Sequence, residues 1–327
     1  MPKPDILMTA PMHPSVAQAL EPHFTLHRLW EQDDKDSFLD ATGPRVRGIA
    51  TSTLFGRVED ALLDRLPALE IIASFGVGYD NVDAVSAARR GVVVTNTPGV
   101  LDDEVADLTV GLLLATLRQI PQADRFLRDG QWLGGSFPLS PTLRGRKIGI
   151  LGLGNIGKAV ARRLQAFGVT IAYHGRSVQP DMPYEFHSTL VSLASACDVL
   201  IAIVPGGANT THLIDRTVLA ALGPDGVLIN VSRGSVVDET ALIAALEAQT
   251  ILAAGLDVFE NEPRVPQALL DLPNLVLLPH IGSASVHTRA AMGQLVADNL
   301  LTWFATGQPV TPVHESSHLL SAPLRGH

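Results

Sequence analysis

The segment KIGILGLGNIG, residues 147–157, decides the fold of this chain. It joins an apolar strand to a G-x-G-x-x-G turn, and a helical pattern over 158–167 follows. In such a turn the first glycine permits the tight bend, the second lets the backbone approach a pyrophosphate, and the third allows the helix to pack closely on the strand. The pyrophosphate would meet the N–H groups at the start of the helix. Because another apolar run, 169–173, follows in register, the segment predicts dinucleotide binding rather than an ordinary strand-to-helix turn. The residues expected to bind the dinucleotide here are Gly152, Leu153, Gly154, Asn155, Ile156 and Gly157.

The residues after the second strand bear on which dinucleotide binds. An NAD-binding unit usually carries an acidic residue about 20 residues beyond the glycines, which accepts hydrogen bonds from the ribose 2′-hydroxyl. This chain instead reads Tyr173-His174-Gly175-Arg176-Ser177. Because a guanidinium pairs with phosphate and a carboxylate repels it, Arg176 with Ser177 and His174 favours NADPH over NADH. Arg176 can equally be a surface arginine that stacks on adenine, which suits either cofactor, and no second Lys or Arg follows nearby.

The composition, with 46% hydrophobic residues, fits a globular protein. The length of 327 residues exceeds that of a typical single domain and therefore suggests two domains. The net charge of −9 is spread along the chain without a Lys/Arg-rich run, which argues against nucleic acid and anionic membrane as partners. The single cysteine, Cys197, suits a reducing compartment. No signal-peptide pattern is present, and the apolar stretch 108–117 is too short to span a bilayer, so we expect a cytoplasmic protein.

Short apolar runs alternate with helical patterns along most of the chain, which predicts parallel sheets built from βαβ units. The first set of predicted strands covers 6–9, 46–50, 70–74 and 92–96, with helices over 15–20, 59–65 and 81–90. The second set has six predicted strands, which suffice for a doubly wound dinucleotide domain: 147–151, 169–173, 199–204, 227–231, 252–256 and 276–278.

Two long helical patterns connect these sets, one from Asp103 to about Arg128 and one from Val286 to about Thr306. The tail after Pro312 is rich in Ser and His and is predicted to be loosely ordered. The expected fold class is therefore α/β with two doubly wound parallel-sheet domains. A Rossmann dinucleotide-binding domain, 102–285, is inserted into a flavodoxin-like substrate domain, 1–101 and 286–327.

Three residues of complementary chemistry follow the late strands of the second set, where a doubly wound sheet collects its ligands. Arg233 can hold a substrate carboxylate and polarise the adjacent carbonyl. His280 can donate a proton to that carbonyl as hydride arrives, and Glu262 can orient the imidazole and favour its protonated form. Asp257 can accept a hydrogen bond from the nicotinamide carboxamide. Taken singly, each residue also has an ordinary interpretation as a surface ion pair, a loop residue or a capped turn.

Several motifs resemble the D-isomer-specific 2-hydroxyacid dehydrogenase family over nearly the whole chain. They are 74–80 (SFGVGYD), 97–100 (TPGV), 231–234 (VSRG), 255–263 (GLDVFENEP) and 279–283 (PHIGS). The resemblance implies that Arg233, Glu262 and His280 form a catalytic triad and that the backbone amides of Val77 and Gly78 meet the substrate carboxylate. It also implies a homodimer formed mainly through the dinucleotide domains, and no metal site is expected.

The resemblance extends to further contacts. Substrate contacts are expected at Leu54 and Ser283 besides Val77, Gly78 and Arg233. Cofactor contacts beyond the glycine turn and Arg176 are expected at Val77, Thr109, His174, Ser177, Val204, Pro205, Thr210, Val231, Ser232, Arg233, Asp257, His280 and Gly282. Leu54 and Phe55 can make part of the pocket apolar and admit a larger 2-keto acid, or can simply pack beneath their loop.

Within the family, residues 173–177 look like the branch of glyoxylate/hydroxypyruvate reductases, whose members commonly use NADPH. Trp132 matches a tryptophan near the dimer loop of such reductases, whereas Gly135 stands where some carry a second tryptophan, which leaves the substrate's size open. Two alternatives stay open. One is a dinucleotide-sensing corepressor-like binding protein of the same fold, and the other is a different dehydrogenase of the family, such as a phosphoglycerate dehydrogenase-like enzyme.

Overall fold

The computed structural model describes residues 2–53 and 56–320, which divide into two compact units. Unit 1 comprises Met1–Leu101 and Ser285–His327, and unit 2 comprises Asp102–Ala284. Each unit is built on its own parallel sheet. The expected fold class, two α/β domains with parallel sheets, is therefore confirmed.

The sheet of unit 1 has the strand order β2-β1-β3-β4-β5, which is the flavodoxin-like order. Its strands in the described part of the unit are β1 (Asp5–Met8), β2 (Thr25–Arg28), β3 (Val46–Ser52), β4 (Ile71–Phe75) and β5 (Val93–Thr95). The sequence predicted four of these and missed β2. This strand lies at the sheet edge and has no fully buried residue, so it lacks the apolar run that marks the others.

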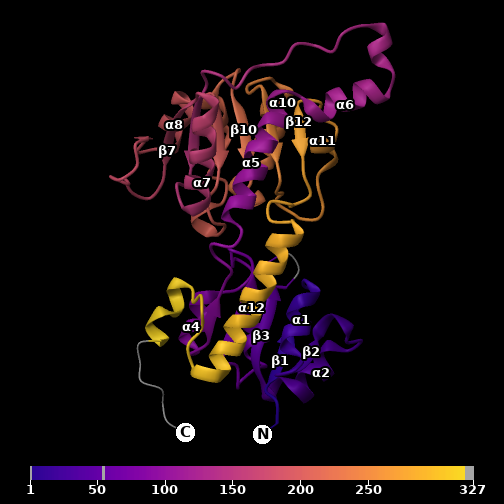
Figure 1. The fold of residues 1–327 in the computed structure, drawn as a ribbon, viewed down its shortest axis with the longest axis vertical. Helices are drawn as coiled ribbons and strands as arrows, with labels where there is room; N and C mark the ends of the chain where they lie inside the picture. Colours follow the sequence, from indigo (N-terminus) through magenta and orange to yellow (C-terminus); the bar gives the residue numbers. More distant parts are fainter. Residues whose placement is uncertain (1, 54–55, 321–327) are drawn as a thin grey trace. The chain divides into compact units, whose positions relative to one another are not determined.

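The α-helices of unit 1 are α1 (Pro14–Leu20), α2 (Lys35–Thr42), α3 (Asp60–Leu63), α4 (Ala84–Arg89) and α12 (Val286–Thr306), and its short 3-10 turns are η1 (Leu29–Glu31), η2 (Gly43–Arg45) and η7 (His314–Leu319). The helix α12 begins and ends where the sequence predicts. It packs against α1 and β4, so the returning chain covers one face of the sheet (Figure 1). The opposite core includes Ile49, Ile72 and Val94, all fully buried.

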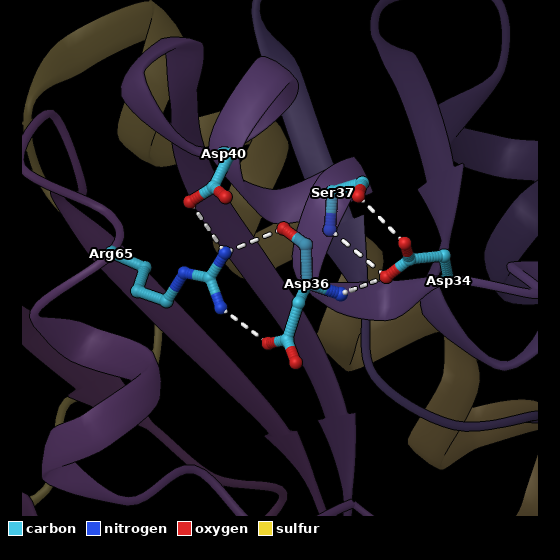
Figure 2. A network of polar contacts seen from close by, with 5 residues as sticks. All are labelled: Asp34, Asp36, Ser37, Asp40 and Arg65. Carbon is cyan, nitrogen blue, oxygen red and sulfur yellow. Dashed lines mark hydrogen bonds and ion pairs between the residues drawn. The ribbon is translucent and has the colours of Figure 1, made fainter.

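The start of α2 is fixed by its own acidic residues and by Arg65 (Figure 2). The carboxylate of Asp34 accepts hydrogen bonds from the Asp36 and Ser37 amides at 3.1 and 3.0 Å, which caps the helix. Arg65 donates to the carboxylates of Asp36 and Asp40 at 2.6 and 2.7 Å. These exposed contacts tie α2 to the segment after α3.

The segment after Pro312 is more ordered than the sequence predicts, as far as residue 320. The Val313 amide donates to the Val94 carbonyl at 2.9 Å, and the Ser316 hydroxyl accepts from the Val94 amide at 2.9 Å. The prediction of a loose tail is wrong here because the chain runs along β5 and satisfies edge groups of that strand.

The sheet of unit 2 has the strand order β12-β11-β10-β9-β6-β7-β8. Counted from β6 this is the doubly wound Rossmann order, extended by one strand. Within the described residues its strands are β6 (Lys147–Leu151), β7 (Thr170–His174), β8 (Glu185–Phe186), β9 (Val199–Ala202), β10 (Val227–Asn230), β11 (Ala253–Leu256) and β12 (Leu275–Leu277). Six match the predicted strands, and β8, only two residues long, gives no periodic signal.

Helices cover both faces of this sheet (Figure 1). Alternate strand residues serve the two faces: in β9, Val199 and Ile201 belong to one buried cluster and Leu200 to the other. The first cluster receives α5 (Asp102–Leu117) and α7 (Asn155–Leu164), and the second receives α8 (Leu190–Ala196), α9 (Arg216–Leu222) and α10 (Glu239–Glu247). The unit also contains α11 (Gln267–Leu270) and the turns η4 (Gln165–Phe167), η5 (Ala208–Thr210) and η6 (Gly234–Val236).

The long helix predicted from Asp103 to about Arg128 is two helices. The helix α5 ends at Leu117, and α6 (Ile120–Arg128) begins after Gln119, whose φ of 50° is left-handed. Pro121 explains the break, since proline has no N–H to donate and its ring would clash with the Leu117 carbonyl. The start of α6 is held to unit 2 by Gln122, whose side-chain amide donates to the Pro273 and Leu275 carbonyls at 3.0 and 3.3 Å. The end of α6 and the turn η3 (Gln131–Gly134) extend away from the rest of the unit (Figure 1).

No helix in the described part of the chain is both long enough and apolar enough to cross a bilayer.

Candidate active site

The glycine turn of unit 2 has the geometry that a phosphate-binding turn requires. Gly152 has a φ of 97°, and a Cβ there would lie 2.3 Å from the Ile203 carbonyl oxygen. A Cβ on Gly157 would lie 2.3 Å from the Gly152 carbonyl oxygen. A Cβ on Gly154, the residue that caps α7, would instead meet no other atom within 4 Å. Two glycines therefore allow the chain to fold back on itself, and the third leaves the helix start open to a ligand.

Two neighbours hold this turn, and the sequence singled out only one. Val204, which follows β9, lies over Gly152: its Cγ1 would be 2.8 Å from a Cβ there. Gln179 was missed, although its side-chain amide donates to the Leu153 carbonyl at 2.8 Å and its backbone amide donates to the Tyr173 hydroxyl at 2.7 Å. A glutamine in a loop carries no sequence signal of such a role.

The candidate 2′-phosphate residues lie at the end of β7. The His174 carbonyl accepts from the Gly152 amide at 2.9 Å, and its ring Nδ1 lies 2.8 Å from the His187 carbonyl oxygen, so Nδ1 carries the proton. Arg176 and Ser177 are exposed. Arg176 makes no hydrogen bond or ion pair with any other described residue, so its guanidinium is available to an anion.

The loop after β9 is closed on itself by Thr210. The Thr210 hydroxyl donates to the Pro205 carbonyl at 2.8 Å and lies 3.0 Å from the Gly207 carbonyl. This predicted cofactor contact therefore shapes its own loop, and Pro205 is exposed beside it.

Arg233 sits in a turn that the buried Asn230 organises. Asn230, the last residue of β10, accepts from the Ser232 amide at 3.1 Å and from the Ser232 hydroxyl at 2.7 Å, and it donates to the Arg233 carbonyl at 3.0 Å. The Arg233 guanidinium donates to the Ser232 carbonyl at 2.8 Å and is half-buried. Val231 is half-buried at the start of this turn. The sequence did not single out Asn230, because an amide residue at a strand end does not by itself specify its hydrogen-bond partners.

Glu262 and His280, which follow different strands, form a hydrogen-bonded pair. Oε2 of Glu262 lies 2.7 Å from Nδ1 of His280, and Oε1 accepts from the Phe259 amide at 2.9 Å. The side chains are 24% exposed for His280 and 26% for Glu262, so both can reach a ligand. With Nδ1 engaged by the carboxylate, Nε2 is the ring nitrogen left for other chemistry.

The electrostatics of this pair keep Glu262 ionised. Burial works to raise the pKa of Glu262, but the hydrogen bond and charge of His280, the Phe259 amide and the Arg233 guanidinium together lower the pKa below its ordinary value. The positive charge of Arg233 is thus among the causes that lower the pKa of Glu262. Arg233, Glu262 and His280 thus form one electrostatic group.

Asp257 supports the turn that carries His280. It is only 1% exposed, and its two carboxylate oxygens accept from the Ile281 and Gly282 amides at 2.8 Å each. Its carbonyl accepts from the His280 amide at 2.9 Å, and His280 has a left-handed φ of 54°. Burial raises the pKa of Asp257, against the opposing effects of the two amides and of His280. Its predicted contact with the nicotinamide carboxamide stays a prediction, because both oxygens already serve the turn.

The remaining predicted site residues differ in burial and belong to both units. Thr109 is fully buried in α5 with its hydroxyl donating to the Val105 carbonyl at 2.7 Å, so a contact with the cofactor stays a prediction. Ser283 is half-buried after Gly282. In unit 1, Val77 and Gly78 are half-buried in the loop after β4. Leu54, with Phe55, lies outside the described residues.

These features fit a dinucleotide. The glycine turn and the start of α7 would hold the pyrophosphate, and the free guanidinium of Arg176 would meet a charged substituent on the ribose. No cluster of three or more His, Cys, Asp or Glu residues in the described part of the chain is arranged to hold a metal ion.

Comparison with known proteins gives one family. Residues 110–282 match the family described as D-isomer specific 2-hydroxyacid dehydrogenase, NAD binding domain. The matched region lies within unit 2 and includes the glycine turn, Arg233, Glu262 and His280.

Several relatives match along nearly their whole length. A hydroxyphenylpyruvate reductase of Plectranthus scutellarioides is 46% identical, over 94% of this chain and 98% of its own. A 2-ketogluconate reductase of Gluconobacter oxydans is 44% identical, over 95% and 99%. An NADPH-dependent glyoxylate/hydroxypyruvate reductase of Sinorhizobium meliloti, solved in complex with NADP and malonate, is 55% identical, over 96% and 98%, with a TM-score of 0.92.

Proposed function

Because the chain belongs to the D-isomer specific 2-hydroxyacid dehydrogenase family, we propose that it reduces a small 2-keto acid, such as glyoxylate, hydroxypyruvate or a related acid, to the D-2-hydroxy acid with NADPH. The observation that carries the proposal is the 2.7 Å pair of His280 and Glu262, in the unit that also holds the glycine turn. An imidazole with one nitrogen on a carboxylate and the other free is suited to donate a proton. Relatives that reduce different keto acids support the reaction class.

Each residue of the group has a part in this reaction. When bound, NADPH supplies the hydride that reduces the carbonyl carbon. In unit 1, the Val77 and Gly78 amides bind the substrate carboxylate and so fix the position of the neighbouring carbonyl. In unit 2, Arg233 polarises the substrate carbonyl and stabilises the negative charge that develops on its oxygen. His280 donates the proton from Nε2 to the carbonyl oxygen, and Glu262 stabilises the charged ring beforehand. In the reverse direction the same Nε2 accepts the hydroxyl proton.

The preference for NADPH rests on the end of β7. Arg176 is exposed and free to pair with a 2′-phosphate, and residues 173–177 contain no acid to repel it. The relative from Sinorhizobium meliloti, which is NADPH-dependent, supports the same preference. NADH is the weaker cofactor on this reasoning, since it would leave Arg176 without a phosphate partner.

We also propose a homodimer through unit 2. The helix α6 has no buried residue, and the following segment exposes 67% of Trp132, 97% of Leu133 and all of Leu139. Large apolar side chains gathered on one projecting segment usually mark an interface. A second copy of the chain is the partner that the family resemblance implies. The cytoplasmic location stays a prediction.

The decisive experiment measures loss of NADPH absorbance with a panel of 2-keto acids, run in parallel with NADH. We expect turnover of at least one small keto acid, faster with NADPH at low cofactor concentration. His280→Ala and Arg233→Ala should lower kcat/KM by about 100-fold or more without changing the melting temperature greatly. A wild-type protein inactive on the whole panel, or a His280→Ala variant as active as the wild type, would refute the proposed chemistry.

A further inference from the structure

We propose that Asn96 is a positioning residue for the substrate carboxylate, because its side chain sets the direction of the backbone N–H of Gly78. The inference rests on the proposed function, which gives the Val77 and Gly78 amides the carboxylate of a 2-keto acid. It assigns a specific task to a polar residue that the catalytic group does not include. All the residues concerned lie in unit 1.

The first step concerns the peptide unit between Val77 and Gly78. The Asn96 side-chain amide, Nδ2, donates to the Val77 carbonyl oxygen at 2.7 Å. That carbonyl and the Gly78 N–H belong to one planar trans peptide unit, in which the two groups point in opposite directions. Binding the carbonyl therefore turns the Gly78 N–H away from Asn96 and holds it there.

The preceding peptide unit is held by the next residue of the same segment. The Thr97 backbone amide donates to the Gly76 carbonyl oxygen at 2.9 Å. By the same geometry, the Val77 N–H points away from segment 96–97. Gly76 itself is closely packed, because a Cβ there would lie 2.5 Å from the Thr53 methyl group. Two consecutive N–H groups are thus directed away from segment 96–97, an arrangement that suits an anion.

These two N–H groups are also available. Val77 and Gly78 are half-buried, and neither N–H donates to any other described residue. Backbone N–H groups at such depth usually have a partner. A carboxylate of the substrate, with two oxygens that each accept hydrogen bonds, would satisfy both.

Asn96 is itself anchored to a buried residue of α12. Its carbonyl accepts from the Thr311 hydroxyl at 2.6 Å, and that hydroxyl accepts from the Asn299 side-chain amide at 2.8 Å. Asn299 is fully buried, and its Oδ1 also accepts from the Val310 and Thr311 amides at 3.0 and 2.9 Å. The direction of the Gly78 N–H is therefore linked through Asn96 to the core of the unit rather than to a surface loop.

The test compares Asn96→Ala and Asn96→Asp with the wild type in steady-state kinetics. The Asp variant keeps the size of the side chain but cannot donate to the Val77 carbonyl when ionised. We expect both variants to raise KM for the keto acid about tenfold or more, with KM for NADPH unchanged. The inhibition constant of oxamate, an unreactive keto-acid mimic, should rise by a similar factor. The matched control is Asn274→Ala, which removes side-chain hydrogen bonds to the Leu246 and Leu252 carbonyls in unit 2 and should leave both constants unchanged.

The outcomes separate this inference from the proposed function. A wild type that reduces keto acids, together with Asn96→Asp at wild-type KM and wild-type oxamate inhibition, would overturn the role of Asn96 and leave the proposed function intact. Equal losses in KM for keto acid and for NADPH would also overturn it, because they would indicate general damage to the fold. A wild type without turnover would overturn the proposed function and this inference with it.

Discussion

Gly234 lies directly against the backbone of Phe259: a Cβ on Gly234 would lie 1.8 Å from the Phe259 carbonyl carbon. It would also lie 2.2 Å from the Glu260 nitrogen. Gly234 follows Arg233, and Phe259 donates its amide to Glu262. The contact therefore couples the turn that holds the arginine to the loop that holds the carboxylate.

Gly234→Ala should consequently reduce activity far more than its size suggests. A methyl group cannot fit at this distance, so one of the two backbones must shift and Glu262 must move relative to His280. We expect kcat/KM to fall by about tenfold or more, since small displacements in an active site are costly. The measurement is steady-state kinetics alongside a thermal unfolding curve.

Gly111→Ala is the matched control for this prediction. Gly111 lies exposed in α5, and a Cβ there would meet nothing within 4 Å. The substitution should leave kcat/KM unchanged and stabilise the helix by about 0.5–1 kcal/mol. If Gly234→Ala behaved like this control, the proposed coupling of the two loops would be wrong.

Glu262→Gln should change the pH profile as well as the rate. The amide can still accept a hydrogen bond, but it provides no negative charge to stabilise an imidazolium. We expect kcat/KM at neutral pH to fall roughly 10- to 100-fold, with the alkaline limb of the profile moved to lower pH. An unchanged limb would indicate that the carboxylate only orients the ring.

The same carboxylate predicts a pH dependence of stability. The folded pKa of Glu262 lies below its ordinary value of 4.5, so its ionised form contributes stability above that value. The contribution is lost as pH falls through the folded pKa. The melting temperature of the wild type should therefore exceed that of Glu262→Gln near neutral pH, and the difference should shrink below pH 4.5. A difference that stays constant down to strongly acidic pH would contradict the assigned direction of the shift.

Arg176→Ala should separate the two cofactors. Loss of a guanidinium that pairs with a 2′-phosphate should raise KM for NADPH about tenfold or more, and KM for NADH much less. Arg144→Ala is the control and should leave both KM values unchanged. Arg144 is an exposed arginine that precedes β6, whereas the glycine turn follows the other end of this strand. Equal effects of Arg176→Ala on the two cofactors would favour the alternative in which the arginine stacks on adenine.

Leu133→Asp should weaken the proposed homodimer. Leu133 is almost fully exposed on the segment after α6, and a charge there would have to be desolvated in an interface. Sedimentation velocity should show a wild-type dimer and a lighter species for the variant at micromolar concentration. Val191→Asp, on an exposed apolar residue of α8, should keep the wild-type mass. A wild-type monomer would refute the dimer outright.

The sequence was sufficient for the elements that have periodic or glycine signals. The turn at 152–157 could be predicted because Gly152 and Gly157 meet requirements that other residues cannot satisfy. Strands such as β9 and β10 are buried on both faces and therefore appear as continuous apolar runs. The edge strands β2 and β8 were not predicted, because they are short and partly exposed and so lack an apolar run.

The parts that the sequence could not predict are mostly hydrogen bonds between distant polar side chains and backbone. Gln179 holds the Leu153 carbonyl and Asn230 holds the Arg233 turn, yet a lone amide residue in a loop or at a strand end specifies no partner. The break between α5 and α6 is different, since Pro121 was visible and should have ended the predicted helix.

The left-handed backbone conformation of His280, held by hydrogen bonds to Asp257, has a thermodynamic consequence. A residue with a Cβ occupies this conformation at a cost of roughly 1–3 kcal/mol, and the surrounding contacts must impose it. This free energy is spent when the chain folds, so the imidazole is already oriented before each turnover. Aligning the proton donor therefore adds no entropy loss to the activation barrier, and the native state is less stable by that amount instead.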